Sequence, residues 1–422
     1  MITAKIFLIS VMLFVSLAKA EIKVCTKVSK SDKTTKSVNL KDQLGPVRNQ
    51  DSVGWCYAFT VADLLTQHLH NKGELRGDPN QKNQQVSPVG IASYYNKKNY
   101  PKYYKRIEKM SSKELQAYNK SQEEKLALKG KKWDTLKVVP QGGVISNAFE
   151  DIKKTGFCME SDAPSESFSI VMAKFCIEKK ICVKNLEEML NSIYDRANFN
   201  KTNKDELCDL YDVVHAAYPT IPEQTLNPLL LKTSRDKIFY DLAQAACIQK
   251  TNFLNLSNKK INIKYSSIDD EKPKVLLQMI DGALEKGNVP AISYYAQFLT
   301  VKDAKKDFLH ASTIVGKYYD PKACEVIYIL RNSWGETCDP YQVLSKDFYL
   351  CKFQVTDEQL RSSMQIGDDP SELKFAKERY CAEKFPGLAR NPNLECDPKT
   401  GYLFVKKSEL KKYLLDVTYL QD

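Results

Sequence analysis

Cys56 is the residue of this chain whose type and position best suit nucleophilic chemistry. It follows a loop punctuated by glycine and proline, and residues 57–69 after it carry apolar side chains at helical spacing. This pattern places the thiol at a helix N-terminus, where unpaired backbone N–H groups and the helix dipole favour the thiolate. Gln50 lies upstream, where the loop could fold it back beside the sulfur as an amide donor. A buried structural cysteine is the alternative interpretation.

A thiol nucleophile also needs a base for its proton and a third group that orients the base. His310 and Asn332 are residues of these types. Residues 310–319 and 324–330 have the composition of two strands joined by a short turn, so we predict that they are antiparallel neighbours. That pairing would bring His310, at the start of the first strand, close to Asn332, just after the second.

The remaining histidines do not predict a metal site. His68 and His70 are two positions apart in a predicted helix and cannot share one of its faces. His215 has no partner motif and is interpreted as a helix-packing residue. The cysteines lack C-x-x-C spacing, so structural zinc is not expected. The sequence therefore predicts no metal and no cofactor.

A second punctuated segment is the glycine pair Gly142-Gly143. Paired glycines let the backbone approach a ligand closely, and the residues after them predict a helix with one apolar face that begins at Ile145. A plain loop before a helix is the alternative interpretation. Further patterns predict a helix over 274–286 and strands over 289–295 and 401–406.

Four segments resemble the papain/cathepsin family of cysteine peptidases, in the order that the family has them. They are Pro46-Val-Arg-Asn-Gln50 with Gly54-Trp-Cys-Tyr-Ala-Phe59, Gly142-Gly143 with Asn147-Ala-Phe149, His310-Ala311 with Val315-Gly316, and Asn332-Ser-Trp-Gly335. The resemblance implies an α+β, papain-like two-lobe fold. It would have a helical left lobe, an antiparallel β-barrel-like right lobe and a cleft between them.

The resemblance also implies catalytic roles. Cys56 would be the nucleophile, and His310 would take its proton and later protonate the leaving amine. Asn332 would orient the imidazole. Gln50 and the backbone N–H of Cys56 would form the oxyanion hole, in which one donor is typically worth about 3 kcal/mol.

Four residues are assigned to substrate binding by the same resemblance. Gly142 and Gly143 would lie along the substrate backbone, and Trp334 would shield the histidine–asparagine hydrogen bond from water. Trp55 stands where the family usually has a small residue, and Tyr57 replaces the usual tryptophan. A bulky indole at Trp55 would narrow the primed side of the cleft or alter the leaving-group site.

The chain departs from the family mainly in length. His310 lies 254 residues after Cys56, against roughly 130–150 in the family pattern. We assign the excess to insertions near 97–132 and 158–280, and a third insertion, 337–399, to the region between two segments that are close in the family. The predicted organisation is a signal peptide (1–20), an N-terminal arm (21–38) and a papain-like peptidase domain (39–422) that carries these insertions.

The first twenty residues have the pattern of a signal peptide. Lys5 precedes an apolar run over 6–17, and Ala18-Lys19-Ala20 fits an A-x-A cleavage site. The run is too short to span a bilayer, and no later segment reaches membrane length. The 12 cysteines of the chain, spread singly, then predict disulfides. We expect an exported protein, secreted, periplasmic or lumenal, without a membrane span.

The net charge of +11 raises the question of a nucleic-acid partner. Much of the excess lies in the lysine-rich stretch 97–132, which also contains tyrosines. A solvated, partly helical insertion accounts for this stretch, and export argues against nucleic acid. The expected partners are protein or peptide substrates, and the insertions are candidate sites for a protein partner or an inhibitor.

The sequence thus predicts an exported cysteine-type endopeptidase that hydrolyses peptide bonds through a Cys56 acyl-enzyme, with His310 as base and acid. Two alternatives stay open. One is a catalytically impaired papain-like scaffold or binding protein, although a scaffold has no need of the intact Cys/His/Asn/Gln set. The other is a thiol acyltransferase on the same fold, which the sequence separates poorly from a hydrolase.

Overall fold

The computed structural model describes the part of the chain that carries these motifs. It covers residues 34–50, 54–99, 142–165, 218–232, 238–248, 261–300, 308–338, 355–364 and 393–421, and also residues 32, 114, 117, 214–215, 306, 341, 376, 380–381 and 391. The predicted signal peptide, most of the arm, almost all of the insertion at 97–132 and much of the other two insertions lie outside the described residues. The division of the chain into these segments stays a prediction.

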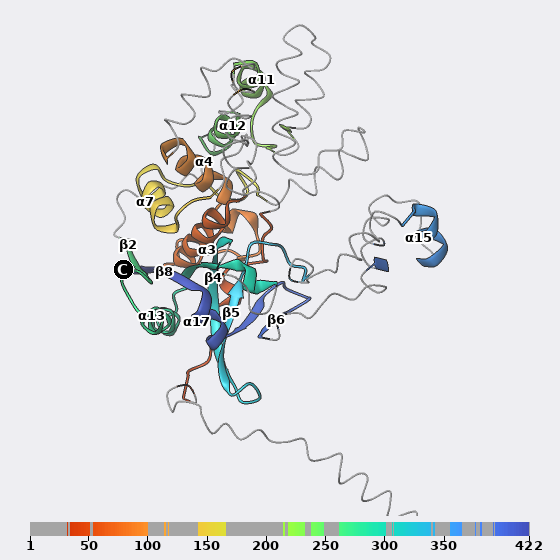
Figure 1. Cartoon of the computed structure of the whole chain (residues 1–422). Coiled ribbons are helices and arrows are strands. Elements are labelled where there is room, and N and C mark those ends of the chain that lie inside the picture. The colour runs from red at the N-terminus through yellow and green to blue at the C-terminus, as the bar shows by residue number, and fades with distance from the viewer. Residues whose placement is uncertain are drawn as a thin grey trace, which may run out of the picture.

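The centre of the helical part is α3 (Cys56–Asn71), in which every residue from Tyr57 to Leu69 is buried. A helix buried on all sides must have neighbours around it. They are α4 (Pro88–Asn99) and α7 (Ile145–Thr155) among the helices and β4 (Leu309–Asp320) in the sheet. Two further helices, α11 (Glu223–Lys232) and α12 (Ile238–Ile248), extend this group, and α12 packs on α4. Figure 1 shows these helices on one side of the sheet.

The strands form an antiparallel sheet of eight strands. Its order is β2 (Asn262–Ser267), β8 (Leu414–Gln421), β3 (Ala291–Tyr295), β4, β5 (Glu325–Arg331), β7 (Leu403–Lys406) and β6 (Leu394–Cys396), with β1 (Val38–Asn39) paired to β4. The last segments of the chain therefore complete the sheet, because β7 extends it beyond β5 and β8 lies between β2 and β3.

The sheet is open, which differs from the barrel-like lobe that was predicted. Among the described residues β2 pairs only with β8, and β6 pairs only with β7. The physical reason lies at the β6 end, where the two outer strands have 3 and 4 residues and offer few backbone groups for closure. The described architecture is thus a mixture of helices and an open antiparallel sheet.

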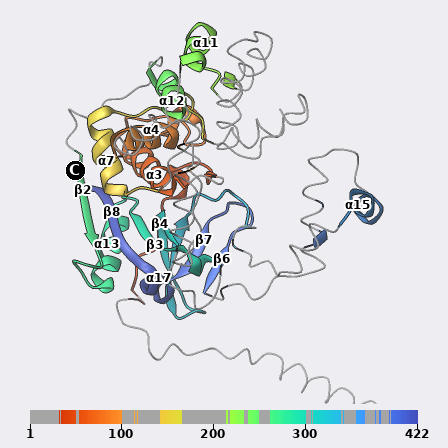
Figure 2. The same ribbon diagram turned by 45° about the horizontal axis from the view of Figure 1, so that its top comes forward.

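Smaller elements cover the rest of the sheet and connect it to the helices. Helix α13 (Pro273–Glu285) packs on β8 and β4, and α17 (Lys407–Tyr413) packs on β5 and β7. Both views place α13 on the far side of the sheet from α4 and α7, and α15 (Asp357–Met364) away from the sheet (Figures 1 and 2). Short 3-10 helices in the described part of the chain are η1 (Lys41–Gln43), η2 (Lys82–Gln84) and η3 (Ala296–Leu299).

Several predicted elements are confirmed. The predicted apolar face after the glycine pair is the buried face of α7, and the predicted helix over 274–286 is α13. The two strands expected around His310 and Asn332 are β4 and β5, whose antiparallel register pairs Asp320 with Glu325 and Thr313 with Arg331. The strands predicted over 289–295 and 401–406 are β3 and β7.

Two disulfides lie near the ends of predicted insertions. Cys158 is bonded to Cys247, and Cys338 is bonded to Cys396. Disulfides are typical of chains that fold in an oxidising compartment. Cys56 is the free cysteine among the described residues. In that same part of the chain, no helix has the length and apolar character needed to cross a bilayer.

Candidate active site

The Cys56 thiol lies at the first residue of α3 and is half-buried. Hydrogen bonds from the backbone of Ala311, Tyr57 and Cys56 itself favour its thiolate, as the helix N-terminus argument predicts. Burial outweighs them and raises the pKa of Cys56 to about 11. Desolvation of the sulfur thus works against the thiolate that the helix end favours.

His310 is the second residue of β4 and is 4% exposed. Its Nε2 lies 2.6 Å from Asn332 Oδ1, so the predicted proximity of these two residues is confirmed. Ala311 follows His310 directly, and its backbone hydrogen-bonds to the Cys56 sulfur. The thiol therefore lies beside β4, the strand that carries His310. Burial lowers the pKa of His310 to about 4, against the opposing effect of the hydrogen bond with Asn332.

The Asn332 side chain has a defined orientation because a backbone donor identifies its oxygen. The backbone N–H of Ser333 donates to Oδ1 at 2.8 Å, and a backbone N–H can only donate. The His310 Nε2 that faces the same oxygen must therefore carry a hydrogen. In the neutral ring this leaves Nδ1 unprotonated, and Nδ1 is the atom that can accept a proton.

Further side chains surround the Asn332 amide. Ser312 donates its hydroxyl hydrogen to Oδ1 at 3.0 Å, and Nδ2 donates to the Tyr341 hydroxyl at 3.0 Å. Trp334 lies between two rings, with its centroid 4.9 Å from that of His310 and 5.5 Å from that of Tyr341. The half-buried indole of Trp334 thus packs beside the His310 ring, and its shielding of the histidine–asparagine hydrogen bond stays a prediction.

Gln50 is hydrogen-bonded to Ser333, the residue that follows Asn332. Its backbone N–H donates to Ser333 O at 2.8 Å, and its side-chain Oε1 accepts from Ser333 Oγ at 2.5 Å. The neighbouring Asn49 forms a bridge with Trp334. The side-chain bond identifies the oxygen of the Gln50 amide, so the other end of the amide carries the two donors that an oxyanion would need.

The glycine pair adjoins the loop that carries the nucleophile. Gly142 N donates to Gly54 O at 2.8 Å, and both Gly142 and Gly143 are exposed. A Cβ atom at Gly143 would lie 2.7 Å from the ring of Tyr57, so only glycine fits above this buried ring. The exposed backbone of the glycine pair is therefore hydrogen-bonded to Gly54, which lies two residues before Cys56 in the sequence.

Trp55, which the resemblance places beside the substrate, is a buried residue. Its side chain is 2% exposed and belongs to the hydrophobic core, and its backbone O accepts from Ala58 N and Phe59 N in the first turn of α3. Tyr57, the other departure from the family pattern, is fully buried and packs on Tyr95 at 4.8 Å between ring centroids. Burial of the indole favours a packing role for Trp55.

A buried ion-pair network joins the elements that carry the site. Asp63 of α3 bonds Arg48 Nη2 through Oδ1 at 2.6 Å and Arg331 Nε through Oδ2 at 2.9 Å. Arg331 also donates to Pro46 O at 2.5 Å and to Gly45 O at 2.9 Å. The network therefore connects the helix that begins at the thiol with the strand that ends at Arg331, directly before Asn332.

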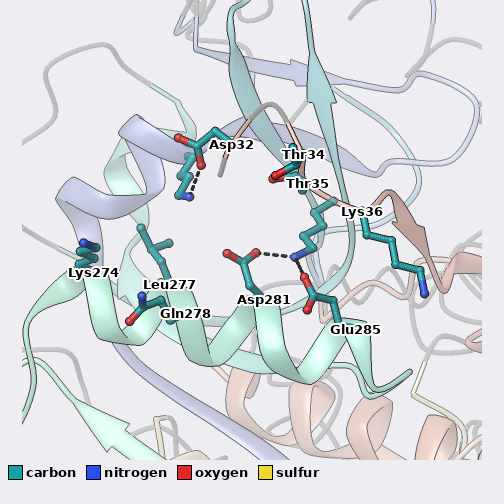
Figure 3. A pocket seen from close by; sticks show the side chains of 11 residues that line it. Asp32, Thr34, Thr35, Lys36, Lys274, Leu277, Gln278, Asp281 and Glu285 are labelled. Carbon is teal, nitrogen blue, oxygen red and sulfur yellow. Dashed lines mark hydrogen bonds and ion pairs between the residues drawn. The ribbon is translucent and has the colours of Figure 1, made fainter. Parts of the chain in front are cut away.

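The structure also contains a pocket elsewhere, of about 690 Å³. Figure 3 shows Asp281 and Glu285 pointing into it from α13. Both carboxylates pair with the buried Lys317, at 3.0 and 2.6 Å. None of the residues described above lines this pocket, so it is separate from the candidate active site.

The sequence motifs pointed to Cys56, His310, Asn332 and Gln50, and they did not include the residues that contact these side chains. Ser312 could have been found, because positions i and i+2 of a strand share a face and it lies two residues after His310. Tyr341 carries no such signal, because it lies within the predicted third insertion. Asp63 was visible only as the one acidic residue of the helical segment 56–71.

Comparisons with known proteins give distant structural likenesses. No protein-family model matches the chain, and no curated protein matches it in sequence. Among solved structures, PepW from Lactobacillus rhamnosis is 12% identical, with a TM-score of 0.39 over 95% of this chain and 84% of that chain. SERA5E from Plasmodium falciparum is 11% identical, with a TM-score of 0.32 over 70% and 79%. Xylellain, a cysteine protease from Xylella fastidiosa, is 14% identical, with a TM-score of 0.30 over 71% and 74%.

Proposed function

We propose that the chain is an exported, papain-like cysteine peptidase that hydrolyses peptide bonds through an acyl-enzyme on Cys56. The observation that carries the proposal is the hydrogen bonding around Asn332. The backbone N–H of Ser333 fixes Oδ1, and Oδ1 in turn requires the hydrogen of His310 on Nε2. This arrangement supplies a base whose Nδ1 is available, on the strand that the thiol contacts.

In the proposed reaction, His310 Nδ1 takes the proton of Cys56 as the sulfur attacks the carbonyl carbon of the substrate. The oxyanion accepts hydrogen bonds from the Gln50 amide and the Cys56 backbone N–H. The same proton then passes from Nδ1 to the leaving amine, which departs as the acyl-enzyme forms. A water molecule, deprotonated by His310, attacks the thioester and releases the acid with regeneration of the thiol.

Burial makes the charged forms of Cys56 and His310 unfavourable when either forms alone. The raised pKa of Cys56 and the lowered pKa of His310 share one cause, the desolvation of the charged forms. A thiolate and an imidazolium formed together neutralise each other, so transfer of one proton costs less than ionising either group alone. Asn332 accepts from the imidazolium more strongly than from the neutral ring.

The proposed substrates are proteins or peptides in an extended conformation. The exposed backbone of Gly142 and Gly143, tied to Gly54, would lie along the substrate chain. Trp334 would border it and exclude water from the His310–Asn332 bond. The disulfides Cys158–Cys247 and Cys338–Cys396 support export, and the insertions near which they lie are candidate sites for a protein partner or an inhibitor.

A second candidate function is a papain-like binding protein with weak or no catalysis. The feature that favours it is the desolvation of the Cys56 sulfur, which raises the pKa of this thiol to about 11. If His310 does not take the proton, about one thiol in ten thousand is ionised at pH 7 by the definition of the pKa. The residue would then react slowly, and the fold would serve recognition.

Labelling with an epoxysuccinyl thiol-protease probe tests the proposal. The purified protein is incubated with the probe, and the modified residue is identified by mass spectrometry, with Cys56→Ser and His310→Gln as matched variants. A panel of dipeptidyl fluorogenic amides is assayed in parallel. Labelling at Cys56 that depends on His310, together with amide hydrolysis, supports the peptidase. A folded protein that is neither labelled nor active would overturn it and favour the binding protein.

A further inference from the structure

Behind the Asn332 amide lie two buried hydroxyl groups that no motif includes. The Tyr294 hydroxyl lies 2.7 Å from Ser312 Oγ, and Ser312 Oγ lies 3.0 Å from Asn332 Oδ1. Ser312 is 2% exposed and Tyr294 is fully buried. Hydroxyl groups buried to this degree cost free energy unless they are hydrogen-bonded. Here the Tyr294 hydroxyl bonds the Ser312 hydroxyl, and Ser312 bonds Asn332 Oδ1, the oxygen that also faces His310.

The sheet brings these side chains together through its register. His310 and Ser312 are two residues apart on β4 and share a face. Tyr294 of β3 is the direct cross-strand partner of His310, and its ring packs edge-on against the imidazole with 5.7 Å between centroids. Tyr294 can therefore reach along this face from His310 to Ser312.

The direction of each hydrogen bond follows from the acceptor at the end of the chain. Asn332 Oδ1 is the oxygen of its amide because the Ser333 backbone N–H donates to it, so it can only accept. The Ser312 hydrogen must then point toward Oδ1. The Tyr294 hydrogen points toward Ser312 Oγ, which has lone pairs to accept it. Burial raises the pKa of Tyr294 well above its ordinary value, so this donor keeps its hydrogen throughout the working range of pH.

We propose that Tyr294 and Ser312 are positioning residues that hold the Asn332 amide with its oxygen toward His310 and so keep the imidazole hydrogen on Nε2. The inference rests on the proposed function, in which Nδ1 must be the proton acceptor for Cys56. A turned amide would present its NH2 group to Nε2 and favour the tautomer with hydrogen on Nδ1. That tautomer cannot take the thiol proton, and a wrong tautomer is a severe defect in a nucleophile–base pair.

The two sides of the amide are held from different parts of the chain. Ser333 N–H and Ser312 O–H fix the oxygen side, and Tyr341 accepts from Nδ2 on the other side. Loss of Ser312 leaves the other two contacts in place, so we expect a partial effect and not an inactive site. A single buried hydrogen bond of this kind corresponds to roughly a tenfold change.

The test compares Ser312→Thr with Ser312→Val, which have the same shape and differ in the hydroxyl. The first measurement is the nitrogen NMR spectrum of protein labelled at histidine, recorded at neutral pH. We expect Ser312→Thr and the unmodified protein to show His310 with hydrogen on Nε2, and Ser312→Val to show a mixture of both tautomers. The second measurement is amide hydrolysis, where Ser312→Val should lower kcat about tenfold with KM unchanged.

Tyr294→Phe provides a second variant that removes only one oxygen atom. It should shift the His310 tautomer in the same direction and less than Ser312→Val does. If both variants are folded and both keep hydrogen on Nε2 in full, the inference is wrong. The tautomer is measured without substrate, so an unmodified protein that shows the Nε2 tautomer and no hydrolysis would overturn the proposed function alone.

Discussion

Asp63 is the residue whose replacement tests most directly how the two halves of the site are joined. It is 7% exposed, and its two carboxylate oxygens bind different arginines, Arg48 at 2.6 Å and Arg331 at 2.9 Å. The side chains of these arginines are 3% and 1% exposed. Asp63→Ala would therefore leave two guanidinium groups in the core without the anion between them.

The expected magnitude depends on the contacts that each arginine keeps. Removing one partner of a buried ion pair typically costs about 3–5 kcal/mol. Arg331 keeps carbonyl acceptors in residues 44–46 and the Tyr402 hydroxyl, and Arg48 keeps Val86 O and a distant carboxylate at 3.6 Å. Both arginines lose their contact with Asp63 at once, and among the described residues only Arg48 keeps an ion pair, the longer one with the buried Glu160. We therefore expect the upper end of the range, about 5 kcal/mol.

Urea unfolding followed by circular dichroism, with disulfides intact, measures this loss. Asp63→Asn keeps the shape of the side chain and one acceptor oxygen, so it should cost less than Asp63→Ala. Glu150→Ala, at an exposed position of α7, is the matched control and should change stability by less than about 0.5 kcal/mol. The rate of Cys56 alkylation should also change in both Asp63 variants, because Asp63 connects α3 to the end of β5.

A loss below about 1 kcal/mol in Asp63→Ala would refute this reasoning. It would mean that water reaches the arginines or that the network relaxes at little cost. Replacing all three members by apolar residues of similar size, as Asp63→Leu with Arg48→Met and Arg331→Met, should recover part of the loss. Failure to recover, in a folded protein, would show that the network has a role beyond mutual charge compensation.

Three further predictions concern the site itself. Burial lowers the pKa of His310 to about 4 in the folded protein, whereas in the unfolded chain its pKa is about 6.5. Its contribution to stability is therefore complete above pH 6.5 and falls by about 3 kcal/mol on going to pH 4. Urea unfolding measured across this pH range should show this loss, and the His310→Gln variant should lack it. Gly143→Ala should destabilise the fold by about 1–3 kcal/mol, because its Cβ would lie 2.7 Å from the Tyr57 ring. Adding Tyr57→Ala should relieve this cost, whereas it should not relieve the backbone strain of Gly142→Ala at φ +79°. If the Gly143/Tyr57 and Gly142/Tyr57 double-mutant cycles are equally additive, the steric explanation is wrong. Tyr341→Phe removes the acceptor of a buried amide N–H, so thermal unfolding should show a loss of about 1–3 kcal/mol, and an unchanged midpoint would mean that another acceptor takes its place.

The sequence predicted the parts of the site that depend on local pattern. Apolar spacing after Cys56 located α3, and two strand-like runs around a short turn located β4 and β5. Antiparallel pairing of neighbouring strands then placed His310 and Asn332 together, at 2.6 Å. These inferences succeed because helix period and hairpin register are properties of short segments.

The charge state of the thiol could not be predicted in the same way. The helix dipole and the backbone N–H groups are visible in the sequence as a helix start, and they do favour the thiolate of Cys56. The larger effect is desolvation, which depends on what distant segments cover the sulfur. Trp55 illustrates the same limit, because nothing in its neighbours along the chain shows that the indole enters the core.

The residues around the Asn332 amide show how a site with widely separated motifs is held in one geometry. Oδ1 is fixed by Ser312 from β4 and by Ser333 from the adjoining loop, and Nδ2 is fixed by Tyr341. Tyr341 N donates to Cys338 O at 3.1 Å, and Cys338 is bonded to Cys396, directly before the last segments of the sheet. The predicted third insertion therefore contacts the Asn332 amide through Tyr341, which lies three residues after the disulfide-bonded Cys338.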